Sequence, residues 1–173
     1  MAAKIRGEKI SPFLWFDTQA EEAVRFYTSI FKGSKILGIN RYNEAGAKAS
    51  RMPSGSVMTV WFQLGGQDFT AINGGPMFKF SPAISFIINC DNQEEIDHFW
   101  GKLTEGGKEG QCGWLTDKFG VSWQVFPVVL GKMLSDKDPE KVARVTEAFL
   151  KMTKFDIREL ERAFEGKALP MRA

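Results

Sequence analysis

TQAEEAVRFYTSIFKGSK, at Thr18–Lys35, matches DNQEEIDHFWGKLTEGGK, at Asp91–Lys108, elsewhere in the same chain. Five of the 18 aligned positions are identical, and Tyr27 matches Trp100 in kind. An internal match of this kind indicates that one supersecondary unit occurs twice. The fold class therefore follows from the elements that surround the two stretches. The identical pairs are Glu21 and Glu94, Glu22 and Glu95, Phe26 and Phe99, Gly33 and Gly106, and Lys35 and Lys108.

Both stretches are predicted to form helices, because apolar residues recur in each at helical spacing. Thr18 and Asp91 are suited to cap the two N-termini, and each is followed three residues later by Glu, as in a capping box. Gly33 and Gly106 follow the last turns, where a left-handed cap favours glycine. The apolar positions are Ala20, Ala23, Val24, Tyr27 and Phe31 in the first helix, and Ile96, Phe99, Trp100 and Leu103 in the second.

Short apolar runs around the helices are predicted to be strands. Residues 10–17 precede the first helix and residues 80–89 precede the second. After each helix comes a hairpin pattern, with a turn glycine at Gly66 or Gly120 and an aromatic residue three positions later. These elements give a βαβββ unit that occurs twice. The polar loop 43–56, which the second copy lacks, is expected to be mobile.

The predicted fold class is α+β, with two βαβββ modules and two added C-terminal helices. Asp138 and Asp156 are expected to cap these last helices. Four aromatic residues are expected to be largely buried: Trp15, Phe26, Trp100 and Trp123. The predicted boundaries are 9–127 for one domain that contains the modules 10–73 and 80–127, then 128–165 for the helical extension and 166–173 for a frayed tail.

Composition argues against several classes of function. The chain is 43% hydrophobic and 25% charged, with a net charge of +2 and no basic cluster, so nucleic acid is not an expected partner. No apolar stretch is long enough to span a membrane, and residues 1–10 lack the apolar centre of a secretory signal. Cys90 and Cys112 have neither metal-binding nor disulfide spacing, so a cytoplasmic location is expected.

The sequence resembles the PhnB-like family of the vicinal-oxygen-chelate superfamily, which includes glyoxalases, bleomycin-resistance proteins and dihydroxybiphenyl dioxygenases. The resemblance covers about residues 9–165, and it implies the glyoxalase/bleomycin-resistance fold and a homodimer. Members of this family often carry the label 3-demethylubiquinone-9 3-methyltransferase. The motifs that carry the resemblance include PFLWFD (12–17), AEEAVRFYTSIF (20–31), NGGPMFKFSPAISFIINC (73–90) and DKFGVSWQVFP (117–127).

The resemblance also implies four positions at which relatives hold a divalent metal with His, Glu or Gln. In this sequence they fall at Ser11 or Pro12, within 81–83, at Thr70 and at Gln124. None is His, Asp or Glu, and one amide cannot hold a divalent ion alone. His98, the one histidine, lies inside the second predicted helix. We therefore expect no tightly bound metal and no cofactor.

The repeat places Thr70 and Gln124 at matching points of the last strands, where the resemblance implies that relatives present a ligand toward a cup between the sheets. Alternation along the first strands adds Phe13, Trp15 and Ser85 to the same lining. These five residues are the candidate substrate-binding residues, and catalytic residues are unknown. Aromatic walls with a few small polar groups suit a small, weakly polar organic ligand. In the alternative arrangement, the cup is filled by its own side chains.

Three functions fit the family in principle. The missing metal ligands favour a protein that binds a small organic molecule without metal. The alternative is an enzyme of the lyase, isomerase or dioxygenase type with an unidentified metal or polar site. Methyl transfer is disfavoured because no glycine-rich G-x-G-x-x-G loop joins a strand to a helix. Gly65-Gly66 and Gly74-Gly75 fall at hairpin and linker positions instead.

Overall fold

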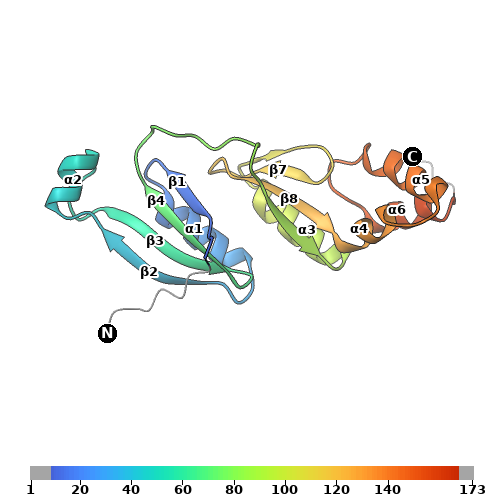
Figure 1. Cartoon of the computed structure of the whole chain (residues 1–173), viewed down its shortest axis with the longest axis horizontal. Coiled ribbons are helices and arrows are strands. Elements are labelled where there is room, and N and C mark those ends of the chain that lie inside the picture. The colour runs from blue at the N-terminus through green and yellow to red at the C-terminus, as the bar shows by residue number, and fades with distance from the viewer. Residues whose placement is uncertain (1–8, 168–173) are drawn as a thin grey trace. The chain divides into compact units, whose positions relative to one another are not determined.

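The computed structural model describes residues 9–167 and divides the chain into two compact units (Figure 1). Unit 1 ends at Phe80 and unit 2 begins at Ser81. Each unit has one four-stranded sheet with both parallel and antiparallel neighbours. The predicted α+β class with two βαβββ modules is therefore confirmed. The N-terminal stretch, in which no secretory signal is expected, lies largely in residues 1–8, outside the described residues. The predicted tail lies largely in residues 168–173, which are also outside them.

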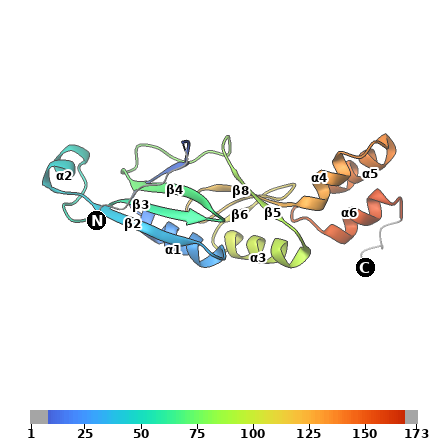
Figure 2. The ribbon, with the colours of Figure 1, turned by 60° about the horizontal axis from the view of Figure 1, so that its bottom comes forward.

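The elements of unit 1 are β1 Phe13–Phe16, α1 Ala20–Ile30, β2 Lys35–Arg41, α2 Glu44–Ser50, β3 Val57–Leu64 and β4 Gln67–Asn73. In its sheet the strands lie in the order β1-β4-β3-β2. β1 runs parallel to β4, and the other neighbours are antiparallel. α1 packs on one face of this sheet (Figure 2).

The core of unit 1 lies between α1 and the sheet. Tyr27 and Val24 of α1 are fully buried against alternate residues of β3 and β4, such as Phe62 and Phe69, whose rings stack with centroids 5.2 Å apart. Full burial of one large apolar side chain contributes roughly 1.5–3 kcal/mol. The buried positions of α1 agree with the prediction except at the last turn, where Ile30 takes the place expected for Phe31.

The start of α1 is stabilised by a residue from a distant strand. Thr18 is not the N-cap as predicted, because the helix begins one residue later, after Gln19, which makes no capping bond with its side chain. Instead, Asn73 of β4 accepts a hydrogen bond at Oδ1 from the Ala20 N–H, at 2.7 Å. The same amide donates to the carbonyl of Val57, at 3.0 Å. Asn73 thus joins α1, β3 and β4.

The elements of unit 2 are β5 Phe86–Cys90, α3 Gln93–Thr104, β6 Lys108–Glu109, β7 Trp114–Thr116, β8 Ser122–Pro127, α4 Val128–Leu134, α5 Pro139–Phe149 and α6 Ile157–Phe164. The sheet order is β5-β8-β7-β6, the same pattern as in unit 1. β5 runs parallel to β8, and α3 packs on one face (Figure 2). β6 and β7, with 2 and 3 residues, are much shorter than β2 and β3 of unit 1, with 7 and 8.

The capping box predicted for the second helix is present but shifted by one residue. Asn92, not Asp91, is the N-cap, and its Oδ1 accepts from the Glu95 N–H at 2.9 Å. In return, the Glu95 carboxylate accepts from the Asp91 N–H at 2.8 Å. The same shift of one residue occurs at α1, where Gln19 and not Thr18 is the N-cap.

The turn between β7 and β8 is held by one buried carboxylate. Oδ1 of Asp117 accepts from the N–H groups of Phe119, at 2.9 Å, and Val121, at 3.0 Å. Oδ2 accepts from the indole N–H of Trp123 at 2.8 Å. Because Asp117 and Trp123 are both buried, these bonds replace water for the carboxylate.

The C-terminal extension holds the two predicted helices and one more. α5 begins after Asp138, which accepts from two backbone N–H groups, and α6 begins after Asp156, as predicted. The further helix, α4, follows β8 directly and was not predicted. Between α5 and α6, the backbone N–H groups of Cys112 and Gly113 donate to the carbonyls of Met152 and Thr153, both at 2.8 Å. The extension is thus part of the structure of unit 2.

Other differences from the prediction are local. The segment expected to be a mobile loop instead contains α2, whose N-cap Asn43 accepts from the Gly46 N–H at 2.8 Å. Both first strands begin later than expected, at Phe13 and Phe86. Trp100 and Trp123 are buried as predicted, whereas Trp15 and Phe26 are half-buried. Within residues 9–167, no helix has the length and apolar character that crossing a membrane requires.

Candidate functional site: the open faces of the two sheets

Each sheet has one face on which its own long helix packs and one face opposite that helix, which we call the open face. On β1, Leu14 and Phe16 are buried toward α1, so Phe13 and Trp15 belong to the open face. On β8, Trp123 and Val125 are buried toward α3, so Gln124 belongs to the open face of unit 2. The alternation therefore places the predicted binding residues on the faces that the helices leave free.

On the open face of unit 1, Thr70 lies at the centre of a row of side chains. It pairs with Phe13 on β1 and with Trp61 on β3. The Phe13 side chain is 59% exposed. The Trp61 ring lies over Gly38 of β2, where a Cβ atom would stand 3.0 Å from the indole Cε3. The result is an apolar surface with one hydroxyl in its middle.

Trp15 shares this face but is engaged by the segment that follows β4. Its indole N–H donates to the carbonyl of Gly75 at 2.9 Å, and its ring meets Phe78 edge-on with centroids 5.0 Å apart. A Cβ atom on Gly74 would stand 2.1 Å from the Trp15 ring, so only glycine fits there. Trp15 therefore holds residues 74–78 against the sheet, and its polar group is already satisfied.

On the open face of unit 2, two predicted binding residues meet directly. The side-chain amide of Gln124 donates to the hydroxyl of Ser85 at 2.8 Å, and both residues are half-buried. Gln124 pairs with Ile87 on β5 and with Trp114 on β7. The Ile87 side chain is 55% exposed. A polar pair thus lies between an aliphatic and an aromatic side chain.

Thr70 and Gln124 occupy equivalent positions, as the repeat predicted. Each lies on the last strand between a residue of the first strand and a tryptophan, Trp61 or Trp114, of the preceding strand. The register also shows that Phe13 corresponds to Ile87. The offset is 74 in the first strands (87 − 13) and 73 in the helices (91 − 18), because of the shorter turn before α3.

The residues at the four family positions do not fit a divalent metal ion. Ser11 and Pro12 precede β1, and residues 81–83 lie before β5. Thr70 offers only a hydroxyl, and the Gln124 amide is already bonded to Ser85. Within residues 9–167, no three His, Cys, Asp or Glu side chains are grouped so as to hold an ion. His98 is an exposed residue of α3.

The glycine pairs have structural roles that differ from nucleotide binding. Gly65 and Gly66, with φ of 54° and 87°, form the β3–β4 hairpin. Gly74 and Gly75 follow β4 and receive the Trp15 ring. Neither pair joins a strand to the N-terminus of a helix, which is the place where a phosphate-binding loop acts.

The two cysteines lie in unlike environments. Cys90 is fully buried at the end of β5, and burial raises the pKa of its thiol to about 12, with further contributions from Glu95 and Asp91. Cys112 is half-buried and has a left-handed backbone, with φ of 56°. Its N–H is fixed to the Met152 carbonyl. Neither cysteine forms a disulfide.

Comparison with known proteins agrees with the architecture. The model of a family described as 3-demethylubiquinone-9 3-methyltransferase matches residues 8–126. The PhnB protein of Bacillus cereus, which is described by the same methyltransferase name, is 39% identical over 70% of this chain and 100% of its own, with a TM-score of 0.63. Protein PA1353 from Pseudomonas aeruginosa is 22% identical over 70% of this chain and 98% of its own, with a TM-score of 0.57. Comparison with curated proteins gave no significant match.

Two βαβββ modules with helix-backed sheets define a protein of the vicinal-oxygen-chelate fold. Within that class, the chain belongs to the PhnB-like family, for which the methyltransferase description above is the family name. The matched region ends at Phe126, so α4, α5 and α6 lie beyond it.

Proposed function

We propose that this PhnB-like protein binds a small, weakly polar organic ligand on the open faces of its sheets, without a divalent metal ion. The observation that carries the proposal is the Gln124–Ser85 hydrogen bond beside the exposed side chain of Ile87. Binding sites for small molecules are mostly apolar, with a few polar groups that fix the orientation of the ligand. The open face of unit 2 has this composition.

The exposed apolar residues support the same proposal. Phe13 and Ile87 take equivalent positions in the two units and are both more than half exposed. Each pairs with one polar residue, Thr70 or Gln124, and a tryptophan lies on the other side of that polar residue. Contiguous apolar surface that includes aromatic rings commonly marks a binding site.

The absence of carboxylate and imidazole groups at the family metal positions supports a metal-independent mode of binding. Thr70 and Gln124 are neutral at all ordinary pH values, so they cannot supply the charge that usually holds a divalent ion. Elemental analysis of protein purified without added metal is expected to find no stoichiometric zinc, nickel, manganese or iron. One such ion per chain would contradict this part of the proposal.

The test is a thermal-shift screen with a library of neutral organic compounds, because a ligand that binds only the native state raises the melting temperature. Compounds that stabilise the chain are then measured against Gln124→Ala. If Gln124 lines a binding surface, this change is expected to leave the free energy of unfolding nearly unaltered and to weaken binding. Gln111→Ala, at an exposed glutamine of the same unit, is the matched control.

The alternative arrangement predicts the opposite result. If Gln124 serves mainly to satisfy other buried groups, its loss should cost about 1–3 kcal/mol of stability, because the partners remain unpaired. A destabilisation of that size, together with a screen that finds no stabilising compound, would refute the proposed function at this face.

A further inference from the structure

The Gln124–Ser85 pair leaves specific hydrogen-bonding groups unused. In the observed bond the Gln124 amide donates to the Ser85 hydroxyl oxygen, so the hydroxyl hydrogen and the Gln124 carbonyl oxygen remain. Within residues 9–167, the side-chain N and O atoms that lack both a partner and contact with solvent are Ser34 Oγ and Thr59 Oγ1. The carbonyl oxygen of Gln124 is therefore accessible from solvent.

The unused groups form one donor and one acceptor side by side, whichever way the amide is oriented. With the observed orientation, Ser85 O–H is the donor and Gln124 Oε1 is the acceptor. If the amide were turned, Gln124 would accept from Ser85, which leaves the amide N–H₂ as donor and the serine oxygen as acceptor. The complementarity of the pair thus does not depend on the assignment of the amide atoms.

The neighbours of the pair define the shape of the ligand. Ile87, Gln124 and Trp114 stand on three adjacent strands, directly opposite one another. Adjacent strands are about 4.8 Å apart, so this row is about 10 Å long. A flat apolar body of two fused six-membered rings has this length, and it would contact the indole and the exposed isoleucine together.

From this arrangement we infer that the ligand of unit 2 is a flat, neutral, bicyclic compound with an amide edge, whose carbonyl accepts from the pair and whose N–H donates to it. The inference rests on the proposed function and specifies its ligand class. A compound that has an acceptor but no donor would cover the Gln124 carbonyl oxygen and leave it without a hydrogen bond. An unpaired buried polar group of this kind lowers affinity by about tenfold or more. In unit 1 the residue equivalent to Gln124 is Thr70, which has a hydroxyl in place of the amide, so the preference belongs to unit 2.

The experiment compares 2-naphthamide with N,N-dimethyl-2-naphthamide, which keeps the rings and the carbonyl but has no N–H. Binding is followed by ¹H–¹⁵N NMR of the side-chain amides, in which the Gln124 signal is assigned by its absence in Gln124→Met. We expect 2-naphthamide to shift the Gln124 N–H₂ signal and to bind about tenfold more tightly than the dimethyl compound. Gln124→Met and Ser85→Ala are each expected to remove this difference.

The outcomes separate the inference from the function on which it rests. If both naphthamides bind equally well, or if another compound shifts the Gln124 signal while 2-naphthamide does not, the amide preference is refuted and the proposed function stands. If neither naphthamide nor any compound of the screen binds, both are refuted. Gln111→Met, which removes an exposed amide of the same unit, is expected to retain the tenfold preference of the native chain.

Discussion

Asp117 makes the clearest single-residue contribution to stability in unit 2. Three donors converge on its buried carboxylate: the N–H groups of Phe119 and Val121 and the indole N–H of Trp123. Asp117→Asn is expected to cost about 1–3 kcal/mol, because one end of the amide cannot accept from the Trp123 indole. Urea denaturation measures the loss. Asp136→Asn, at an exposed carboxylate, is the control, and an equal effect of the two changes would contradict the prediction.

Cys90 is expected to be inert in the folded chain. Its pKa, raised to about 12 mainly by burial, keeps the thiol protonated where an ordinary thiol would ionise. A thiol reagent at about pH 8 is therefore expected to modify Cys112 only, and Cys112→Ser should abolish labelling until the chain unfolds. Fast labelling of native Cys112→Ser would contradict this.

The raised pKa of Cys90 also sets a direction for stability at high pH. Below the ordinary thiol pKa of 9.0, both folded and unfolded chains hold the proton, so this group has no effect. Above it the unfolded chain loses the proton first, and the free energy of unfolding falls as pH rises toward the folded value. Cys90→Ala should remove this part of the pH dependence.

The helix caps show which single-residue roles a local sequence pattern can predict and which it cannot. Gly33 and Gly106 have the left-handed backbone that their positions after the helices predicted. The N-caps were misplaced by one residue in both helices. At α1 the bond to the first free N–H comes from Asn73, which is distant in sequence. A local pattern cannot identify such a partner.

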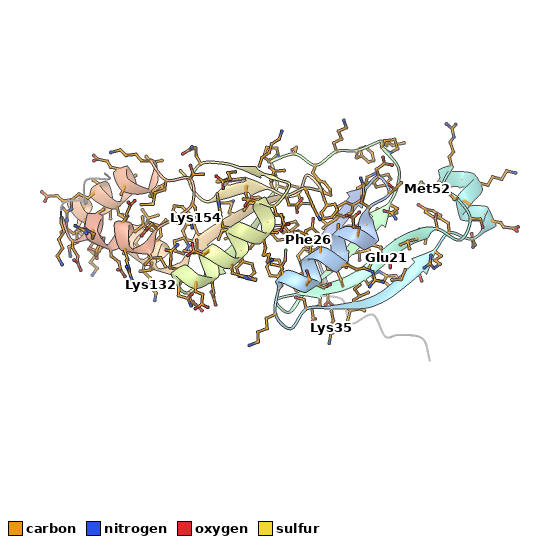
Figure 3. The ribbon with its side chains drawn as sticks, turned by 180° about the vertical axis from the view of Figure 1, so that it is seen from behind. Glu21, Phe26, Lys35, Met52, Lys132 and Lys154 are labelled. Atoms are coloured by element: carbon orange, nitrogen blue, oxygen red, sulfur yellow. The ribbon has the colours of Figure 1, made fainter. Side chains whose placement is uncertain are left out.

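At the scale of elements, the segment between α5 and α6 fixes the extension to α3. The side chain of Gln93 donates to the Phe155 carbonyl at 3.1 Å and accepts from the Ile157 N–H at 2.9 Å. Lys154, labelled in Figure 3, forms an ion pair with Asp97 at 2.5 Å. These contacts join the first turns of α3 to the segment before α6.

The hydrogen bond from Lys154 lowers the pKa of Asp97, with a further contribution from Gln93. The stability associated with this shift is present above the ordinary pKa of the carboxyl and is lost as pH falls through the lowered folded value. Lys154→Ala is expected to return the pKa toward its ordinary range, which NMR titration of Asp97 measures. Lys151→Ala, at a nearby exposed lysine, should leave the titration unchanged.

Several elements could be predicted only in part from sequence. α1, α3, α5 and α6 each have an apolar stripe and acidic residues in the first turn, and all four were predicted. α4 was missed because its residues, VVLGKML, continue the apolar run of β8 without a helix signal. The short β6 was hard to delimit because its two residues are a strand only through their pairing with β7.

At the scale of the whole molecule, we propose that the chain forms a homodimer. Exposed apolar residues occur on both open faces and on the extension, where Leu150 is 58% exposed. Light scattering at micromolar concentration is expected to give twice the mass of one chain. Phe13→Ser and Leu150→Ser, tested separately, should identify which surface contributes. A monomeric mass for the native chain would contradict the proposal.

The candidate site could be predicted from sequence at the level of faces but not of contacts. The repeat placed Thr70 and Gln124 at equivalent points, and strand alternation put Ser85 on the same side as Gln124. The bond between Ser85 and Gln124 depends on the register of β5 against β8, which the sequence pattern did not specify. Trp15 was placed correctly on its face, but its engagement by Gly74 and Gly75 depends on a backbone path that composition does not encode.

The backbone bonds between residues 112–113 and 152–153 have a consequence for solubility. β6 ends at Glu109, and Cys112 and Gly113 lie just before β7 with no β6 residue beside them. Without the extension, their N–H groups would be unpaired at this edge of the sheet. Bare sheet edges promote the stacking of chains into aggregates. The segment from the extension covers this edge. A chain that ends at residue 127 is therefore expected to form sedimenting aggregates at concentrations where the full chain stays clear.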